Sequence, residues 1–316
     1  MEAIAVFWQG AEDWLLVHFL LPALSFTGLS GTVQNPRGIA EFLMINLIQI
    51  SVICLLFRPL EAAVPVEQWP DRKLTRVDFF YTVLKGLGLV PMFSFVLLAP
   101  LGHWLGGFGG LIDTGDTSRI AEWFPWFNSH PVPLFFVYFV LLDFVAYWVH
   151  RLQHRLPFWW AMHSLHHSQR QLSCWSNDRS HILDDAIEAV ITAMTSLIIG
   201  VPPGQYAVLI LFGTLIENFS HANVRLRFGP VLDKLLVDPR FHRTHHILAR
   251  PDEPHLHDCN YALVFPVWDI MFGTARYGLV AEKTGVMDPG IDADNTTFWL
   301  GQQIAGFRRL GRVLGL

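Results

Sequence analysis

The chain carries 15 histidines, and eight of them fall in three short motifs. The motifs are one H-x3-H pair and two H-x2-H-H triplets, formed by His150 and His154, by His163, His166 and His167, and by His242, His245 and His246. At this histidine frequency one such triplet arises by chance in roughly a few per cent of chains, so two triplets and a pair indicate a site. A ninth histidine, His221, lies between the two triplets in the sequence.

The spacing of these histidines suits metal binding. Residues three or four apart lie about 6 Å from each other on one helix face, so each motif can direct two imidazoles at one site. Adjacent histidines diverge by about 100° around the helix, so a triplet can serve two neighbouring ions. One ion takes about four to six ligands, and nine imidazoles therefore predict a dinuclear centre that is itself the catalytic group.

The ligand type narrows the choice of metal. Imidazole binds zinc, copper, iron and nickel alike. A closed structural zinc site needs only four ligands, and a two-metal hydrolase normally adds bridging carboxylates. A ligand set that is nearly all imidazole and lies beside apolar segments favours redox-active iron.

Other residues near the motifs have open roles. His181 is expected at the start of a helix, either supporting a ligand or binding metal, and His257 is an equally undecided addition. Metal-bound imidazoles need hydrogen-bond acceptors that fix their tautomer. Three carboxylates are candidate acceptors, although each could equally be a helix-end or surface group: Asp143, Asp184 and Asp238. The stretch between His167 and His181 is unusual, because it places Asp178 and Arg179 near the expected site.

The composition indicates a membrane protein. Apolar residues make up 52% of the chain and charged residues 16%, whereas a soluble domain carries about 25% charged residues. The net charge of -5 gives no sign of a nucleic-acid partner. Cys54, Cys174 and Cys259 are scattered, which argues against a disulfide framework or a thiolate zinc site.

Apolar stretches of nearly spanning length precede the histidine motifs. Four predicted spanning helices lie at about 14–29, 40–57, 79–99 and 132–149. A further apolar pair at about 186–217 is broken by Val-Pro-Pro-Gly, which predicts a helical hairpin that enters the membrane and returns. Basic residues concentrate in 58–78 and after 149, which places these segments in the cytoplasm.

These elements predict an all-α, multi-pass integral membrane protein. It has four spanning helices, a helical membrane hairpin and a cytoplasmic, histidine-rich helical cap that holds a dimetal site. We divide the chain into a transmembrane region at 1–149, a histidine-box catalytic region at 150–277 and a C-terminal tail at 278–316.

The ordered motifs resemble the fatty acid hydroxylase and sterol desaturase superfamily of integral membrane di-iron enzymes. The resemblance runs from about Asp143 to Thr274. It includes Asp-x3-Tyr-Trp-x-His-Arg before the first pair, His-x-Asn-Val-Arg at His221, Asp-Pro-Arg-Phe-His before the second triplet, and the closing Asn260-Tyr261 and Trp-Asp-x2-Phe-Gly-Thr segments. Asn260 is therefore expected to support the metal ligands.

The sequence departs from the superfamily pattern at two positions. Ala262 stands where members usually have glycine after the Asn-Tyr pair, and Arg225 stands where some fatty-acid hydroxylases carry a further histidine. One iron would then have fewer imidazoles, and a water, His257 or His181 could complete its coordination.

The resemblance implies an oxidoreductase that uses two iron ions, cycling between Fe2+ and Fe3+, and O2 as co-substrate, with zinc as an alternative occupant in purified protein. It implies a lipid substrate taken from the bilayer, and an external electron donor such as a ferredoxin, a cytochrome or a reductase. Hydroxylation is slightly favoured over desaturation. Both begin with the same hydrogen abstraction, so no residue in the sequence distinguishes the two outcomes. Sterols, fatty acyl chains, alkylglycerols, carotenoids and aminolipids remain candidate substrates. A metal-dependent membrane lipid hydrolase is the main alternative, and a metal-storing or metal-transporting membrane protein is another.

Overall fold

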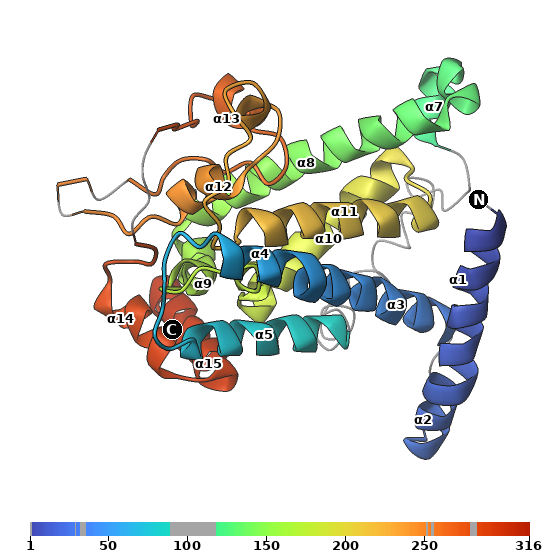
Figure 1. Cartoon of the computed structure of the whole chain (residues 1–316), viewed down its shortest axis with the longest axis horizontal. Coiled ribbons are helices and arrows are strands. Elements are labelled where there is room, and N and C mark those ends of the chain that lie inside the picture. The colour runs from blue at the N-terminus through green and yellow to red at the C-terminus, as the bar shows by residue number, and fades with distance from the viewer. Residues whose placement is uncertain are drawn as a thin grey trace.

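A computed structural model describes residues 2–28, 30–31, 36–88, 118–250, 252–253, 256–278 and 283–316. These residues form helices joined by turns, with three isolated β-bridges and no strand within the described ranges. The predicted all-α class is therefore confirmed for the described part of the chain. Figure 1 shows the long helices running beside one another, with the short helices α12, α13 and α14 gathered at one end.

Two of the helices are long and apolar enough to cross a membrane. One is the continuous run of α3 (Pro36–Val52), a π-helical segment (Ile53–Phe57) and α4 (Arg58–Ala63), and the other is α8 (Pro131–Arg155). They contain 28 and 25 residues, which at about 1.5 Å per residue exceeds the roughly 30 Å hydrocarbon core. They correspond to the predicted spans at 40–57 and 132–149.

The structure does not confirm the other two predicted spans. The stretch at 14–29 belongs to a helix formed by α1 (Glu2–Leu15), a π-helical segment (Leu16–Leu20) and α2 (Leu21–Phe26), which does not meet the same length and hydropathy criterion. Of the stretch at 79–99, the structure describes only the start, in α5 (Lys73–Gly86), and residues 89–99 lie outside the described residues.

The predicted hairpin is present as two antiparallel helices, α10 (Ile182–Ile199) and α11 (Pro203–Ser220). Gly200 ends α10 with φ 72°, a left-handed conformation that glycine adopts without steric cost. The next residues turn the chain, and α11 begins at a proline, which fits the first turn of a helix. The helices extend a few residues beyond the predicted 186–217.

The proline pattern also places the first histidine motifs. Proline at position 157 ends α8 at Arg155, because the residue before a proline avoids helical geometry. The same proline begins α9 (Pro157–His167), so the pair at the end of α8 and the triplet at the end of α9 are joined by a sharp corner. Asp238 caps α12 (Pro239–His245) by accepting a hydrogen bond from the Phe241 backbone N–H at 2.7 Å.

The remaining described helices are short, apart from α15. They are α7 (Arg119–Trp123), α13 (Val267–Met271), α14 (Pro289–Asp292), α15 (Trp299–Leu314) and 3-10 turns at Pro125–Ser129, Ser176–Asp178, Leu232–Lys234 and Ala293–Thr296. Segment 278–316, predicted as a tail, ends in α15, which packs along α9. Arg309 of α15 donates a hydrogen bond to the Ala161 carbonyl of α9 at 2.9 Å. The C-terminal helix therefore supports the helix that carries the first triplet.

Candidate metal centre

The structure brings all nine motif histidines into one buried cluster where the ends of α8, α9, α11 and α12 meet. Eight of these residues are at most 7% exposed, and the side chain of the ninth, His154, is 1% exposed. Eight of the nine fall into two groups whose ligand nitrogens lie within 4.8 Å of one another. The first group is His150, His154, His167 and His245, and the second is His166, His221, His242 and His246.

The distances between ring nitrogens suit metal coordination. Two nitrogens bound at about 2.1 Å to one ion, at right angles to each other, lie about 3.0 Å apart. In the first group the Nε2 atoms of His154 and His167 are 3.1 Å apart. In the second group His221 Nε2 lies 3.1 Å from His166 Nε2 and 3.0 Å from His242 Nε2. Each group therefore has the spacing of ligands that converge on one ion.

His163 belongs to neither group and lies between them. Its ring centroid is 5.3 Å from His150 and 5.1 Å from His167 of the first group, and 5.3 Å from His166 of the second. Its Nε2 atom is buried without a hydrogen bond. This position allows His163 to complete the coordination of an ion in either group.

Hydrogen bonds at Nδ1 set the tautomer of five cluster histidines. An Nδ1–H that donates leaves Nε2 with its lone pair, which is the form that binds metal. The acceptors are Tyr261 O for His150 (2.8 Å), Asp184 Oδ2 for His163 (2.9 Å), Arg179 O for His166 (3.1 Å), Glu217 O for His221 (2.7 Å) and Cys259 O for His245 (2.7 Å). The Nε2 atoms of His150 and His245 are buried without a hydrogen bond. Such buried lone pairs are costly unless a ligand occupies them.

Electrostatics keep five of the cluster imidazoles uncharged. Burial lowers the pKa of each well below 6.5, and neighbouring imidazoles lower it further: His166, His167, His242, His245 and His246. Near neutral pH these side chains are therefore in the neutral form, with a lone pair available. The donor set, its buried nitrogens and its spacing fit a pair of metal ions.

One short loop supplies two of the backbone acceptors. Asn260 is the one non-glycine residue in the described ranges with a positive φ, 56°, and this turn lets the flanking Cys259 and Tyr261 carbonyls both face the cluster. The Asn260 amide donates to the Phe241 and Arg276 carbonyls and accepts from the Arg276 backbone N–H. Asn260 thus acts on the histidines through its neighbours' carbonyls.

The alanine that departs from the superfamily pattern fits this loop. Ala262 is fully buried, its φ is not positive, and its N–H donates to Asp269 at 2.8 Å. Burial raises the pKa of Asp269, and hydrogen bonds from Thr274, Ala262 and Tyr261 counteract that effect. The backbone conformation at position 262 therefore requires no glycine.

The three candidate carboxylates have different roles in the structure. Asp184 accepts from His163 and also from Gln153 and Trp159, so it acts directly on a cluster histidine. Asp143 instead holds the loop after Tyr261, because its oxygens accept from the Val264 and Phe265 N–H groups and the Trp268 indole. Asp238 caps α12, and burial raises its pKa to about 6.

His181 lies outside the cluster. Its Nδ1 accepts a hydrogen bond from the Leu183 N–H at the start of α10, and its Nε2 lies 3.1 Å from the Gln303 carbonyl of α15, to which it donates. Both ring nitrogens are therefore engaged, and His181 acts as a helix-start residue. His257 lies at the edge of the cluster, where it stacks on Trp160, and its ring centroid is 6.1 Å from that of His154. His154, His257 and Asp258 form a third group of potential ligands.

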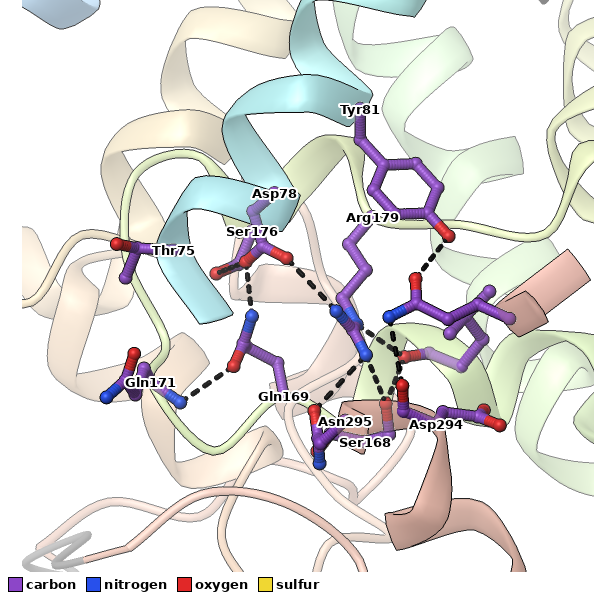
Figure 2. A network of polar contacts seen from close by, with 12 residues as sticks. Thr75, Asp78, Tyr81, Ser168, Gln169, Gln171, Ser176, Arg179, Asp294 and Asn295 are labelled. Carbon is purple, nitrogen blue, oxygen red and sulfur yellow. Dashed lines mark hydrogen bonds and ion pairs between the residues drawn. The ribbon is translucent and has the colours of Figure 1, made fainter. Parts of the chain in front are cut away.

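A buried polar network around Arg179 supports the end of α9, and Figure 2 shows Asp78, Ser168 and Asn295 gathered about the Arg179 side chain. The fully buried Arg179 guanidinium donates to Leu165 O (3.1 Å), Asp78 Oδ1 (3.3 Å), Ser168 Oγ (3.0 Å) and Asn295 Oδ1 (3.2 Å). The Arg179 carbonyl accepts from His166. The sequence marked Arg179 as unusual without indicating this role, because the partners come from distant segments.

Two connected cavities lie beside the histidines. The larger has a volume of about 580 Å³ and lies among α3, α5, α8, α10 and α11. The smaller, of about 70 Å³, is lined by His150, His163, His166, His221 and His242 together with polar residues of α10 and α11. A ligand in the larger cavity can therefore reach the histidine cluster through the smaller one.

Comparison with known proteins finds one matching family and several relatives. Residues 135–274 match the model of the fatty acid hydroxylase family. The human alkylglycerol monooxygenase is 35% identical over 136 residues, which cover 43% of this chain and 29% of the relative. The chain thus spans under a third of that relative's length. The ornithine lipid hydroxylase of Rhizobium tropici is 26% identical over 314 residues, covering 97% of this chain and 89% of the relative.

A third relative is named for a different reaction. The very-long-chain aldehyde decarbonylase of indica rice is 26% identical over 174 residues, covering 51% of this chain and 25% of the relative. No solved structure matches the chain.

Proposed function

We propose that this chain, whose residues 135–274 belong to the fatty acid hydroxylase superfamily, is a membrane-bound, O2-dependent di-iron enzyme that hydroxylates a lipid. The observation that carries the proposal is the cluster of nine buried histidines, arranged as two groups of four with His163 between them. Its neighbouring cavity supports a lipid substrate, because most of the lining of that cavity is apolar.

The composition of the two groups favours iron and oxidation over hydrolysis. Two-metal hydrolases hold both ions with bridging carboxylates as a rule. Neither four-histidine group found among the described residues includes a carboxylate. Bound iron would supply activation of O2 and removal of hydrogen from an unactivated C–H bond, with electrons from an external ferredoxin, cytochrome or reductase.

The chain's own residues prepare the site for that chemistry. The Cys259 and Tyr261 carbonyls and the Asp184 carboxylate orient imidazoles and fix their tautomers. Burial keeps bulk water from the cluster and keeps the imidazoles of His167 and His245 neutral. The large cavity binds the lipid so that part of it reaches the small cavity beside His150 and His163.

The extent of the similarities favours one substrate class. The ornithine lipid hydroxylase matches this chain along nearly its whole length, whereas the match with the human alkylglycerol monooxygenase covers 43% of the chain. The aligned segments with the bacterial enzyme include the membrane helices that line the large cavity. We therefore propose an aminolipid as the substrate, hydroxylated rather than desaturated.

The membrane arrangement forms part of the proposal. Four spanning segments would put the basic 58–78 loop and the histidine cap on the cytoplasmic side, following the distribution of lysine and arginine. The α10–α11 hairpin would enter the same leaflet from the cap. A lipid could then move sideways from the leaflet into the cavity without exposing its chain to water.

The test combines metal content with lipid chemistry. Protein purified without oxygen is expected to hold about two irons per chain and, with reductant and 18O2, to add one labelled oxygen to a host lipid seen by mass spectrometry. His242→Ala and His245→Ala, one in each group, are expected to lose iron and activity. His130→Ala is the control, because His130 is a half-buried histidine that stacks on Trp126 and belongs to neither group. Full activity with zinc in the absence of oxygen would overturn the proposal.

A further inference from the structure

The large and small cavities meet at a ring of shared residues. Both are lined by Lys85, Ala146, Asn177, Asp185, Glu188, Glu217 and Leu263. Five of these seven side chains are charged or carry an amide. The path from the lipid-sized cavity to the histidine cluster therefore passes through a polar zone, which we call the junction.

The two cavities beyond the junction differ in chemistry. The large cavity continues along α8 and α11 past side chains such as Phe139, Leu142 and Ile210. The small cavity adds Gln153, Ser180 and Asp184 to the histidines. Placing a hydrocarbon chain among these polar groups is unfavourable, and so is placing a polar head group in the apolar part.

We propose that the substrate binds with its head inward: a cationic amine head group occupies the junction and the small cavity, and the acyl chain fills the large cavity. This inference rests on the proposed lipid hydroxylase function and specifies how that substrate is recognised. It also assigns Glu188 and Glu217 as the residues that bind the ammonium group.

The charges at the junction support a cation. Lys85 is matched by two carboxylates, because its Nζ lies 3.1 Å from Asp185 Oδ1 and 3.6 Å from Asp178 Oδ1. Glu188 on α10 and Glu217 on α11 lie close enough to interact electrostatically. Within the described ranges, the Glu188 carboxylate forms no hydrogen bond or ion pair with another residue.

Lys85 attracts Glu188 and Glu217 as well as its two ion-pair partners, so four carboxylates share one ammonium group and repel one another. An ammonium group between Glu188 and Glu217 would remove that repulsion and form charge-assisted hydrogen bonds with both. An anionic or neutral head group would gain neither effect. The junction therefore discriminates in favour of an amine.

The histidines that line the small cavity support the same position for the head group. His150, His163 and His242 line it, each is more than nine-tenths buried, and each has one ring nitrogen without a hydrogen bond. The unbonded nitrogens of His150 and His163 are Nε2 atoms available to the candidate metal centre, and His242 belongs to that centre through its Nε2. A head group at the junction would place its own carbon atoms nearest that centre, so oxidation is expected on the head group.

The large cavity has the length that an acyl chain requires. Its lining along α11 extends from Tyr206 to Glu217, a distance of about 16 Å at the helical rise. Glu217 lies near the cap end of α11, and Tyr206 lies near the hairpin turn. A lipid already in the leaflet, with its head at the membrane surface, could enter in this orientation without turning over.

The experiment compares two lipids that differ at the amine, which is charged in one and acetylated and neutral in the other. The probes are an ornithine-containing acyl lipid and the same lipid with its amine acetylated, and each is titrated into the iron-loaded, full-length protein in nanodiscs. We expect the acetylated lipid to bind about tenfold more weakly to the wild-type protein. Glu188→Gln and Glu217→Gln are expected to reduce this preference toward unity, with metal content and thermal unfolding measured in parallel. The wild-type comparison requires no variant to fold.

Thr192→Val is the matched control, because Thr192 lines the large cavity and not the small one. This substitution is expected to change the binding of both lipids equally and to leave the preference between them unchanged. The head-inward proposal is overturned by equal binding of the two lipids to the wild type, or by fragment masses that place the added oxygen on the acyl chain. Oxidation of both lipids with equal binding would leave the hydroxylase function standing without the amine site. A preserved binding preference without any oxidation would support the site and reject the hydroxylase function.

Discussion

Replacing Asp184 with asparagine tests whether the tautomers of the histidine cluster control metal binding. Asp184 Oδ1 accepts from Gln153 at 2.8 Å and from the Trp159 indole at 2.7 Å, and Oδ2 accepts from His163 Nδ1 at 2.9 Å. Among the described residues, these three donor atoms have no other hydrogen-bond acceptor. Asparagine retains one oxygen and presents an NH2 group where the second oxygen was.

The least costly orientation keeps the asparagine oxygen on Gln153 and Trp159. The NH2 group then faces His163 Nδ1, which must accept rather than donate. In that tautomer the proton lies on Nε2, which removes the lone pair available to a metal. Loss of such a supporting acceptor typically lowers metal affinity about 10- to 100-fold, equivalent to about 1.4 to 2.8 kcal/mol.

The assay measures iron content and iron affinity of the anaerobically purified Asp184→Asn protein against wild type. Asp143→Asn is a matched control, because Asp143 is also buried and also accepts three hydrogen bonds, but from Val264, Phe265 and Trp268. Both variants lose a charged acceptor, so both are expected to unfold at a lower temperature. Only Asp184→Asn is expected to lose iron affinity by the stated factor.

The reasoning is refuted if the two variants lose iron to the same extent at matched stability. Iron binding would then depend on the general integrity of the fold and not on the tautomer of His163. Retention of wild-type affinity in Asp184→Asn would equally refute it.

Three other substitutions test the supporting structure. Gly306→Ala would place a Cβ 2.3 Å from His181 Cδ2, so we expect it to lower the free energy of unfolding by about 1–3 kcal/mol. Gly311→Ala is the control, because its Cβ would meet no atom closer than 3.9 Å, and thermal unfolding should show it to be neutral or stabilising. His181→Ala is expected to lower the unfolding temperature and leave metal content unchanged, and loss of one metal equivalent would show that His181 is a ligand. Asn260→Ala loses the Asn260 side-chain hydrogen bonds and strains a positive φ, so it should lower both stability and metal content more than Asn260→Gly, measured by calorimetry and metal analysis.

The nine cluster histidines could be predicted because helical spacing is a local property. Residues three and four apart share a face wherever a helix forms, and the prolines at 131 and 157 fix where α8 and α9 begin. The hairpin was predictable for a similar reason, since prolines and a glycine interrupt an otherwise continuous apolar stretch. Their metal-binding role remains a prediction.

The supporting contacts could not be predicted with the same methods. Two imidazoles are oriented by the Cys259 and Tyr261 carbonyls, and a backbone carbonyl has no residue-type signature in a sequence. Asp143 is a candidate acceptor in the sequence, and in the structure its oxygens accept from the loop at 264–268 instead of from a histidine. The contacts of His150 with the Tyr261 carbonyl and of Asp143 with Val264 join segments more than a hundred residues apart, which local spacing does not reveal.

The C-terminal segment shows why the cluster cannot be understood from the histidine motifs alone. The backbone of α9 is held at the Ala161 carbonyl by Arg309 and at the Leu165 carbonyl by Arg179. Arg309 is in turn paired with Asp294, and Arg179 with Asn295, so both anchors reach into the segment after residue 278. Imidazole nitrogens about 3 Å apart tolerate little movement of the helix that carries them. The position of the first triplet therefore depends on residues more than 120 positions further along the chain.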